Sequence, residues 1–286
     1  MKIKNIFVMG AGAMGSGITQ VSVQAGYNVT MMDIKEEFIT RGLDSIEKSL
    51  SRIVKKGGIS EKEKARILSS INTTTDINDA KDADLVIEAI PEVLELKLDA
   101  FEKLDRICPE HTILASNTSA LPISAMAAAT KRQPKVIGTH FMNPVPVMKG
   151  VEIIPARHTS NETLQTTKDY VKSLGKEPCE AADYAGFTAS RVLDVMLNEA
   201  VNCVMEGNKP EEVDKTMKLC CNLPMGPLEL LDLTGLDIIC HSLETMHKEL
   251  GERFRPSPLL VSMVRAGDLG RKTGRGFYDY TKEASK

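Results

Sequence analysis

The sequence predicts an α/β domain with a mostly parallel sheet, followed by an all-helical domain. The chain's 286 residues suit about two domains of ordinary size. In the N-terminal part, short runs rich in Val, Ile and Leu alternate with helix-like stretches, as in a parallel sheet covered by helices. From Phe187 onward helix-like spacing dominates. We therefore expect two domains, residues 1–184 and residues 185–286.

The first domain is predicted to hold strands that are short and apolar, as strands buried on both faces are. These strands are expected at residues 3–9, 28–33, 84–90, 112–116, 136–140, 150–155 and 177–181. Between them, polar and apolar residues at helical spacing predict helices at residues 15–25, 36–56, 60–70 and 161–174.

The second domain begins with a predicted long helix. Its apolar residues recur at helical spacing: Val192, Val195, Met196, Ala200 and Val204. Pro224, Gly226 and Pro227 interrupt the helical pattern and are predicted to open one further helix that runs through Leu250.

Composition narrows the class of protein. Hydrophobic and charged contents of 42% and 26% are ordinary for a soluble globular chain. A net charge of -3 and a pI of about 6.0 lack the overall positive charge that is typical of nucleic-acid-binding proteins. Met1 leads directly into a predicted strand and no apolar run reaches the ~18 residues of a membrane span, so we expect a cytoplasmic protein. Six cysteines without a C-x-x-C pair are expected to be reduced thiols, and no metal site is expected.

The first predicted strand ends in a glycine pattern. Gly10, Gly12 and Gly15 form G-x-G-x-x-G between a strand and a helix, the setting in which this motif binds a dinucleotide. Phosphates would meet the unpaired amides of the helix N-terminus. Asp33 ends the second strand, where a carboxylate can bind ribose hydroxyls and repel a 2′-phosphate, so NAD is favoured over NADP. The alternative is a glycine-rich turn with an unrelated Asp. The pattern predicts a Rossmann-type domain.

Three polar residues near later strand ends could carry a hydride-transfer reaction. His140 ends a predicted strand, and histidine suits the removal of a hydroxyl proton near neutral pH. Glu152 in the next strand could orient the imidazole and stabilise its charged form. Ser119 follows another strand and could bind the reacting oxygen. Taken singly, each residue could equally be structural.

The run from Gly138 to Lys149, GTHFMNPVPVMK, resembles the signature of the L-3-hydroxyacyl-CoA dehydrogenase family, in particular its bacterial 3-hydroxybutyryl-CoA dehydrogenases. Further similar stretches lie at residues 10–17, 88–92, 116–119, 225–229 and 272–278. The resemblance implies an NAD-dependent enzyme that interconverts a short (S)-3-hydroxyacyl-CoA and the 3-ketoacyl-CoA.

The resemblance also implies roles for individual residues. His140 would be the catalytic base, Glu152 its partner and Ser119 a contact to the substrate hydroxyl. Cofactor contacts on the nicotinamide side would come from Glu92, Lys97 and Asn143, with Lys272 near the cofactor. For CoA, the family pattern points to Ser49 and Lys56, which are seven residues apart and so share a helix face. A solvated lysine face is the alternative explanation of Lys56.

One position departs from the family pattern. Where the family has P-G-F-x-x-N-R, this chain reads AGFTASR over residues 185–191, so Ser190 replaces an Asn that donates a hydrogen bond towards the substrate oxygen. Serine is shorter and has a single donor, so the contact is lost or passes through a water. The departure puts full activity in question and leaves the cofactor prediction unchanged.

Two other readings remain open. Dehydrogenases of the 3-hydroxyisobutyrate and 6-phosphogluconate type share the glycine opening, but they use a Lys base on the first long helix of the second domain, and residues 184–208 contain no Lys. The second alternative is an NAD-binding protein of low activity in which Ser190 marks the loss of catalysis.

The second domain also suggests an oligomeric state. Leucines lie close together at positions 228, 230, 231 and 233, and the family that this chain resembles is generally dimeric through this domain. We therefore expect a homodimer through the second domain.

Overall fold

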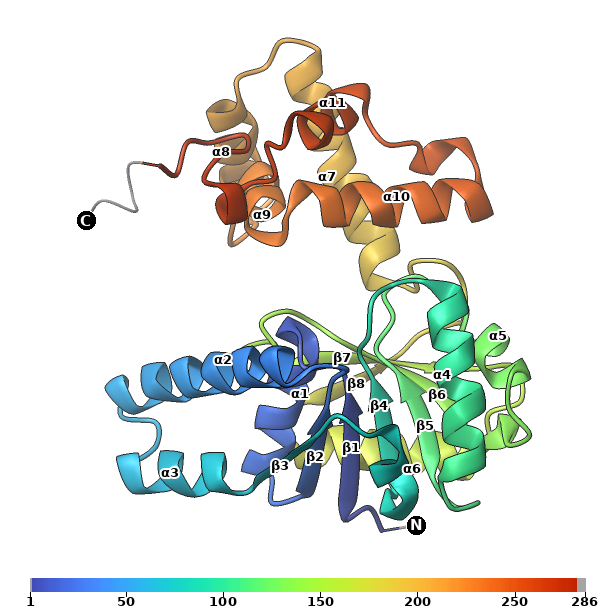
Figure 1. The fold of residues 1–286 in the computed structure, drawn as a ribbon. Helices are drawn as coiled ribbons and strands as arrows, with labels where there is room; N and C mark the ends of the chain where they lie inside the picture. The colour runs from blue at the N-terminus through green and yellow to red at the C-terminus, as the bar shows by residue number, and fades with distance from the viewer. Residues whose placement is uncertain (1, 282–286) are drawn as a thin grey trace. The chain divides into compact units, whose positions relative to one another are not determined.

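The computed structural model describes residues 2–281 and divides the chain into two compact units (Figure 1). Unit 1 ends at Asp183, and unit 2 begins at Tyr184. No helix among residues 2–281 is both long and apolar enough to cross a membrane.

Unit 1 is built on an eight-stranded sheet with the order β3-β2-β1-β4-β5-β6-β7-β8. All neighbouring strands are parallel except β6 and β7. The predicted fold class is therefore confirmed. The strands are β1 (Asn5–Met9), β2 (Asn28–Met32), β3 (Ile71–Thr74), β4 (Leu85–Glu88), β5 (Ile113–Ser116), β6 (Val136–Phe141), β7 (Gly150–Pro155) and β8 (Glu177–Glu180).

Helices cover both faces of this sheet. One apolar cluster joins the sheet to α1 (Ala13–Gln24), α2 (Glu36–Lys55), α3 (Glu61–Ser69) and α6 (Asn161–Ser173). On the other face lie α4 (Leu94–Ile107) and α5 (Ile123–Ala128), which are neighbours in Figure 1. Gly138 in β6 makes room for α5, because a Cβ there would lie 3.0 Å from Cδ1 of Ile123. Short 3-10 helices span Ile77–Asp82 and Gln133–Lys135.

The predicted elements of unit 1 are present within two residues at each end. Three further elements, β3, α4 and α5, lie outside the predicted set. The edge strand β3 has the sequence INTT, with a single large apolar residue, so it lacks the apolar run by which the buried strands are predicted.

β6 and β7 form an antiparallel pair whose connecting loop is held by Lys176. The register places His140 of β6 directly opposite Glu152 of β7. Nζ of Lys176 donates hydrogen bonds of 2.6 Å to the carbonyl oxygens of Val145 and Met148 in the loop between the two strands. Burial lowers the pKa of the Lys176 ammonium.

Unit 2 is helical, but one predicted helix is divided. Its helices are α7 (Ala189–Met205), α8 (Pro210–Cys220), α9 (Pro227–Thr234), α10 (Leu236–Leu250) and α11 (Pro258–Ala266), with 3-10 turns at Glu252–Phe254 and Arg271–Thr273. The prediction of one continuous helix through Leu250 is wrong, because the chain turns at Gly235. This residue has φ +108, a conformation that only glycine adopts at little cost.

Two buried carboxylates hold the last described segment of unit 2. Asp232 accepts hydrogen bonds of 2.9 Å from the backbone amides of Phe277 and Tyr278. Asp214 accepts a hydrogen bond of 2.7 Å from the hydroxyl of Tyr278. A Cβ on Gly276 would lie 2.0 Å from Oδ1 of Asp232, so this close approach requires glycine. Much of the stretch 272–278 therefore has a structural role.

Candidate active site

The glycine-rich loop has the form that a bound pyrophosphate requires. Gly10 has φ +108, and a Cβ on Gly15 would lie 1.8 Å from the carbonyl oxygen of Gly10, so both positions need glycine. A Cβ on Gly12 would meet nothing within 4 Å, so this side of the loop is open. No side chain caps the N-terminus of α1, which leaves its first amides available to phosphate oxygens. The loop fits a dinucleotide.

Asp33 follows β2 and is joined to this loop. Its Oδ2 accepts the amide of Ala11 and its Oδ1 the amide of Ile34, each at 2.7 Å. These bonds fix a half-buried carboxylate beside the glycine-rich turn. A fixed negative charge here suits ribose hydroxyls and opposes a 2′-phosphate.

Glu92 joins the loops that follow β4 and β5. Its Oε1 accepts the hydroxyl of Thr118 at 2.5 Å and the amides of Ser119 and Ala120 at 2.9 and 3.3 Å. The side chain of Glu92 is 29% exposed, so the carboxylate is held by the protein yet reaches solvent. The backbone of Ser119, the predicted substrate contact, is therefore fixed by Glu92, a predicted cofactor contact.

Lys97 is buried, with 1% of its side chain exposed. Its Nζ lies 2.5 Å from Oε1 of Glu88, 3.3 Å from Oε2 of Glu92 and 3.3 Å from the carbonyl oxygen of Ile90. Nζ donates hydrogen bonds to Glu88 and to the carbonyl oxygen of Ile90, and it forms an ion pair with Glu92. The structure thus brings Lys97 to Glu92, as expected for residues of one site, but surrounds its ammonium with protein groups.

His140 and Glu152 form a buried pair at the carboxyl end of β6. Nδ1 of His140 lies 2.9 Å from Oε2 of Glu152, and both side chains are 7% exposed. The pairing follows from the β6–β7 register, in which the two residues face each other. Oδ1 of Asn117 accepts the amide of Phe141 at 2.9 Å and so fixes the strand beside the imidazole.

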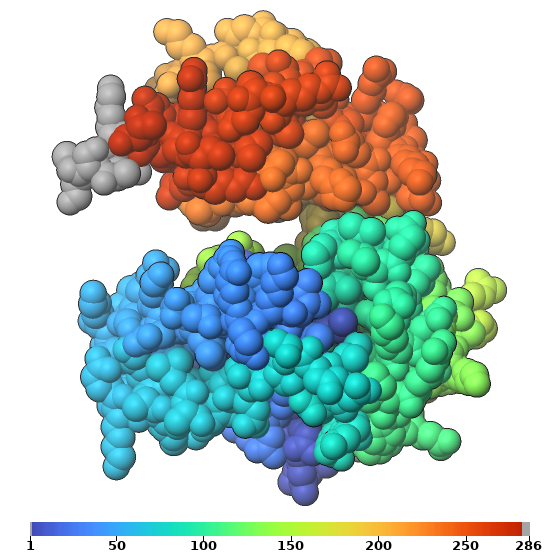
Figure 2. All heavy atoms as spheres, in the orientation of Figure 1, coloured from blue at the N-terminus to red at the C-terminus, as the bar shows by residue number. Residues whose placement is uncertain are grey.

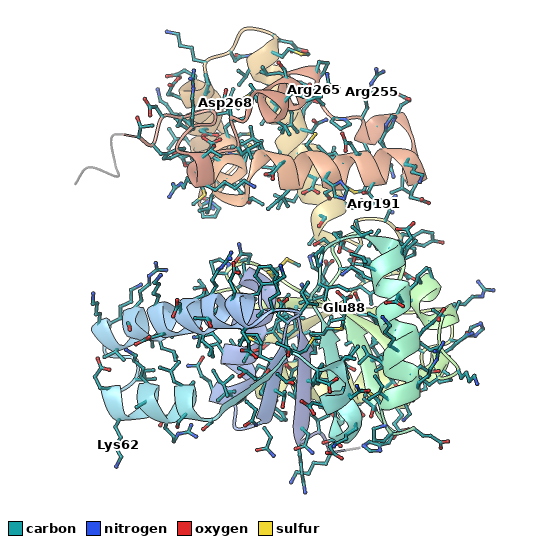
Figure 3. All side chains as sticks on the ribbon, in the orientation of Figure 1. Lys62, Glu88, Arg191, Arg255, Arg265 and Asp268 are labelled. Atoms are coloured by element: carbon teal, nitrogen blue, oxygen red, sulfur yellow. The ribbon has the colours of Figure 1, made fainter. Side chains whose placement is uncertain are left out.

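These groups converge because they follow strands that run the same way. Five neighbouring strands, in the order β2-β1-β4-β5-β6, are all parallel to one another. Their carboxyl ends therefore lie at one edge of the sheet, where ligands bind in open α/β sheets. Figure 3 shows Glu88 at this end of β4. Asn143 lies two residues beyond β6, in an exposed part of the same loop system.

The two residues assigned to CoA lie on α2 or at its end. Ser49 is half-buried on α2, and Lys56 is the exposed C-cap residue of this helix. α2 and α3 pack together and form one continuous surface of unit 1 (Figure 2). Lys48, Arg52 and Lys55 are also exposed on α2, so Lys56 belongs to a wider basic surface.

The remaining two predicted residues belong to unit 2. Ser190 is half-exposed in the first turn of α7. Nζ of Lys272 lies 2.5 and 2.6 Å from the two carboxylate oxygens of Asp237, so its charge is paired within unit 2.

Four residues that organise this edge of the sheet have no role among those predicted from the sequence. They are Glu88, Ser116, Asn117 and Thr118. A usable signal was present, since a Glu and a Ser stand at the last positions of two buried strands that are neighbours in the sheet. Buried polar groups require partners, and each of these side chains finds one.

Comparisons with known proteins show the family of this chain. Residues 5–184 match the family model of the 3-hydroxyacyl-CoA dehydrogenase NAD-binding domain, and residues 186–280 match that of the C-terminal domain. The chain is 49% identical over 287 residues to a probable 3-hydroxybutyryl-CoA dehydrogenase of Bacillus subtilis, with all of both chains covered. It is 45% identical over 277 residues to the 3-hydroxybutyryl-CoA dehydrogenase of Clostridioides difficile, covering 96% of this chain and 99% of the relative.

Solved structures give the same result. The crystal structure of Mycobacterium tuberculosis FadB2 superposes with a TM-score of 0.96 at 42% identity, covering 98% of this chain and 100% of the other. That of (S)-3-hydroxybutyryl-CoA dehydrogenase PaaH1 from Ralstonia eutropha has a TM-score of 0.92 at 42% identity, with the same coverage. The cofactor is NAD, and the reaction class is the oxidation or reduction of 3-hydroxyacyl-CoA thioesters. Both parts of the chain thus match in sequence and in fold, and the chain belongs to the 3-hydroxyacyl-CoA dehydrogenase family.

Proposed function

We propose that this chain interconverts (S)-3-hydroxybutyryl-CoA and acetoacetyl-CoA, with His140 as the base that takes the hydroxyl proton. The observation that carries the proposal is the buried His140–Glu152 pair at 2.9 Å, at the edge of the sheet that also holds the glycine-rich loop. The choice of substrate is supported by the relatives, several of which are 3-hydroxybutyryl-CoA dehydrogenases.

In the oxidation, the hydroxyl proton passes to the His140 imidazole as the C3 hydrogen leaves with its electron pair and a C=O bond forms. NAD supplies the hydride acceptor when it is bound. Glu152 accepts a hydrogen bond from Nδ1 and stabilises the imidazolium that forms, since a charged partner strengthens such a bond. The Ser119 hydroxyl binds the reacting oxygen. In the reduction, the imidazolium returns the proton.

The cofactor would be held mainly by groups of unit 1. The turn of Gly10, Gly12 and Gly15 would face the pyrophosphate, and Asp33 the adenosine ribose. Glu92 and Asn143 would contact the nicotinamide side of the cofactor. Lys97 would contribute indirectly, through its ion pair with Glu92. Lys272 is retained as a weaker candidate, because its ammonium is already paired with Asp237.

Ser49 and Lys56 would bind a CoA phosphate. The exposed position of Lys56 and the basic residues around it support this assignment.

The protein would form a homodimer through unit 2. This dimer would cover large apolar side chains that are exposed in unit 2, among them Leu219 at 76%, Val192 at 67% and Ile238 at 53%.

The reduced thiols support a cytoplasmic location for the protein.

A direct assay tests the reaction. Adding acetoacetyl-CoA to the protein and NADH should consume NADH, and a series of longer 3-ketoacyl-CoA thioesters should give lower kcat/KM. His140→Gln should lower kcat at least about 10²-fold, the usual size of an acid–base contribution, while NADH affinity stays within a fewfold. Near-normal turnover in His140→Gln would remove the proposed mechanism.

A second candidate, an NAD-binding protein of low activity, is favoured by one observation, the Ser at position 190 in the first turn of α7. The same assay separates the two. Tight NADH binding without consumption of NADH on adding any thioester in the series would favour the second candidate.

A further inference from the structure

Glu88 is fully buried at the end of β4, and the reaction proposed above does not use it (Figure 3). Its Oε1 lies 2.5 Å from Nζ of Lys97 and accepts the amide of Ile90 at 2.8 Å. Its Oε2 accepts the hydroxyl of Ser116 at 2.6 Å. A buried carboxylate with this many donors is held firmly in place.

Glu88, Lys97 and Glu92 form one charged cluster. Two carboxylates and one ammonium leave one net negative charge, and Lys97 is shared unequally between the two acids. Its Nζ is 2.5 Å from Glu88 but 3.3 Å from Glu92, so most of its charge is neutralised inside the protein. Glu88 and Lys97 are 0% and 1% exposed, whereas Glu92 is 29% exposed. The net negative charge therefore lies on the member that reaches the open edge.

We propose that Glu88 is a positioning residue that neutralises Lys97, so that Glu92 keeps its negative charge for the nicotinamide ring. The inference rests on the proposed contact between Glu92 and the nicotinamide side of the cofactor. The ring is a cation in NAD⁺ and neutral in NADH. A negative charge beside it thus stabilises the oxidised form more than the reduced form. Glu88 thereby adjusts which redox form of the cofactor the protein prefers.

The test compares the dissociation constants of NAD⁺ and NADH, measured by calorimetric titration of the folded protein in one buffer. In Glu88→Gln, the amide keeps the shape and can still bond to Lys97 and Ser116, but the ammonium is left with Glu92 as its only anion in the cluster. The ratio Kd(NAD⁺)/Kd(NADH) should rise about tenfold, equivalent to roughly 1.4 kcal/mol. Ser116→Ala changes the same network without changing its charge and should leave the ratio within about twofold.

The double variant Glu88→Gln/Lys97→Met separates charge from structure. It removes both buried charges, which is better tolerated than removing one of them, and it restores one net negative charge on Glu92. The ratio should return to within about threefold of the unmodified protein. A purely structural role for Glu88 predicts instead that the double variant is at least as disturbed as Glu88→Gln.

Glu92→Gln distinguishes this inference from the proposed contact on which it rests. An unchanged ratio in Glu92→Gln means that Glu92 does not face the nicotinamide, and both proposals fall. A raised ratio in Glu92→Gln with an unchanged ratio in Glu88→Gln overturns the role of Glu88 alone. If Glu88→Gln does not fold, a raised ratio in the double variant overturns the proposal, and a restored ratio supports it.

Discussion

Glu152→Gln tests the catalytic pair most directly, because it removes the charge and keeps the size of the side chain. The bond to Nδ1 of His140 is 2.9 Å long and lies between side chains that are each 7% exposed, so bulk water screens it little. A hydrogen bond to a charged group contributes about 1.5–3 kcal/mol, and one between neutral groups about 0.5–1.5 kcal/mol. The midpoints of the two ranges differ by about 1.25 kcal/mol, which is nearly tenfold in rate if it is lost as the imidazolium forms.

A second effect acts in the same direction. If the glutamine amide turns its NH₂ group towards Nδ1, that nitrogen must accept, the proton moves to Nε2, and Nε2 can no longer act as the base. We therefore expect kcat to fall by about 10- to 100-fold. The proposed dinucleotide contacts of the glycine-rich loop and Asp33 do not involve Glu152, so the affinity for NADH should stay within about twofold.

The assay is NADH consumption with saturating acetoacetyl-CoA, and NADH titration of the same samples is the control. Glu152→Gln should add little to His140→Gln in the double variant, because the two residues act as one unit. A kcat within threefold of the unmodified protein, or full additivity of the two losses, would refute the proposed pairing.

Three further predictions follow from other parts of the chain. Because the carboxylate of Asp33 should bind the ribose hydroxyls, kcat/KM should be more than about tenfold higher with NADH than with NADPH. Asp33→Ala should reduce this difference, and equal kcat/KM values with the two cofactors in the unmodified protein would contradict the assignment. Ser190→Asn should restore an amide donor and raise kcat about tenfold or more with acetoacetyl-CoA at saturating NADH; an unchanged or lower kcat would mean that this donor is not what the site lacks. Burial raises the pKa of the Cys108 and Cys240 thiols to about 11. Both thiols should therefore react with a disulfide reagent only after unfolding, while the exposed thiols react at once. Rapid labelling of Cys108 or Cys240 in the native protein, measured by mass spectrometry, would argue against this burial.

Features that depend on neighbouring residues could be predicted well. Gly10 and Gly15 are needed for reasons within a few residues of the chain, a positive φ and a backbone contact at the start of α1. The apolar strands and the amphipathic helices of unit 1 follow from the same local patterns. β3 is an exception, because it has too few apolar residues to be recognised by its pattern.

The break at Gly235 shows a second limit. The leucines on both sides of it continue a helical pattern, and only the positive φ of Gly235 separates α9 from α10. Glycine inside a helical pattern is compatible with either outcome, because its cost in a helix is only about 1 kcal/mol. Packing within unit 2 decides between the two.

The fold class, the cofactor loop and the types of residue at the strand ends can be predicted from the sequence, because they depend on local conformation and on the common direction of parallel strands. Which polar groups meet depends on the folded sheet. The antiparallel register of β6 and β7 pairs His140 with Glu152, and the close bond from Lys97 to Glu88 leaves Glu92 as the exposed acid. Both results come from residues that are brought together by strand pairing and by the need to match every buried charge with a partner. That requirement acts across the folded sheet, so the local pattern of the chain does not identify the partner of each buried charge.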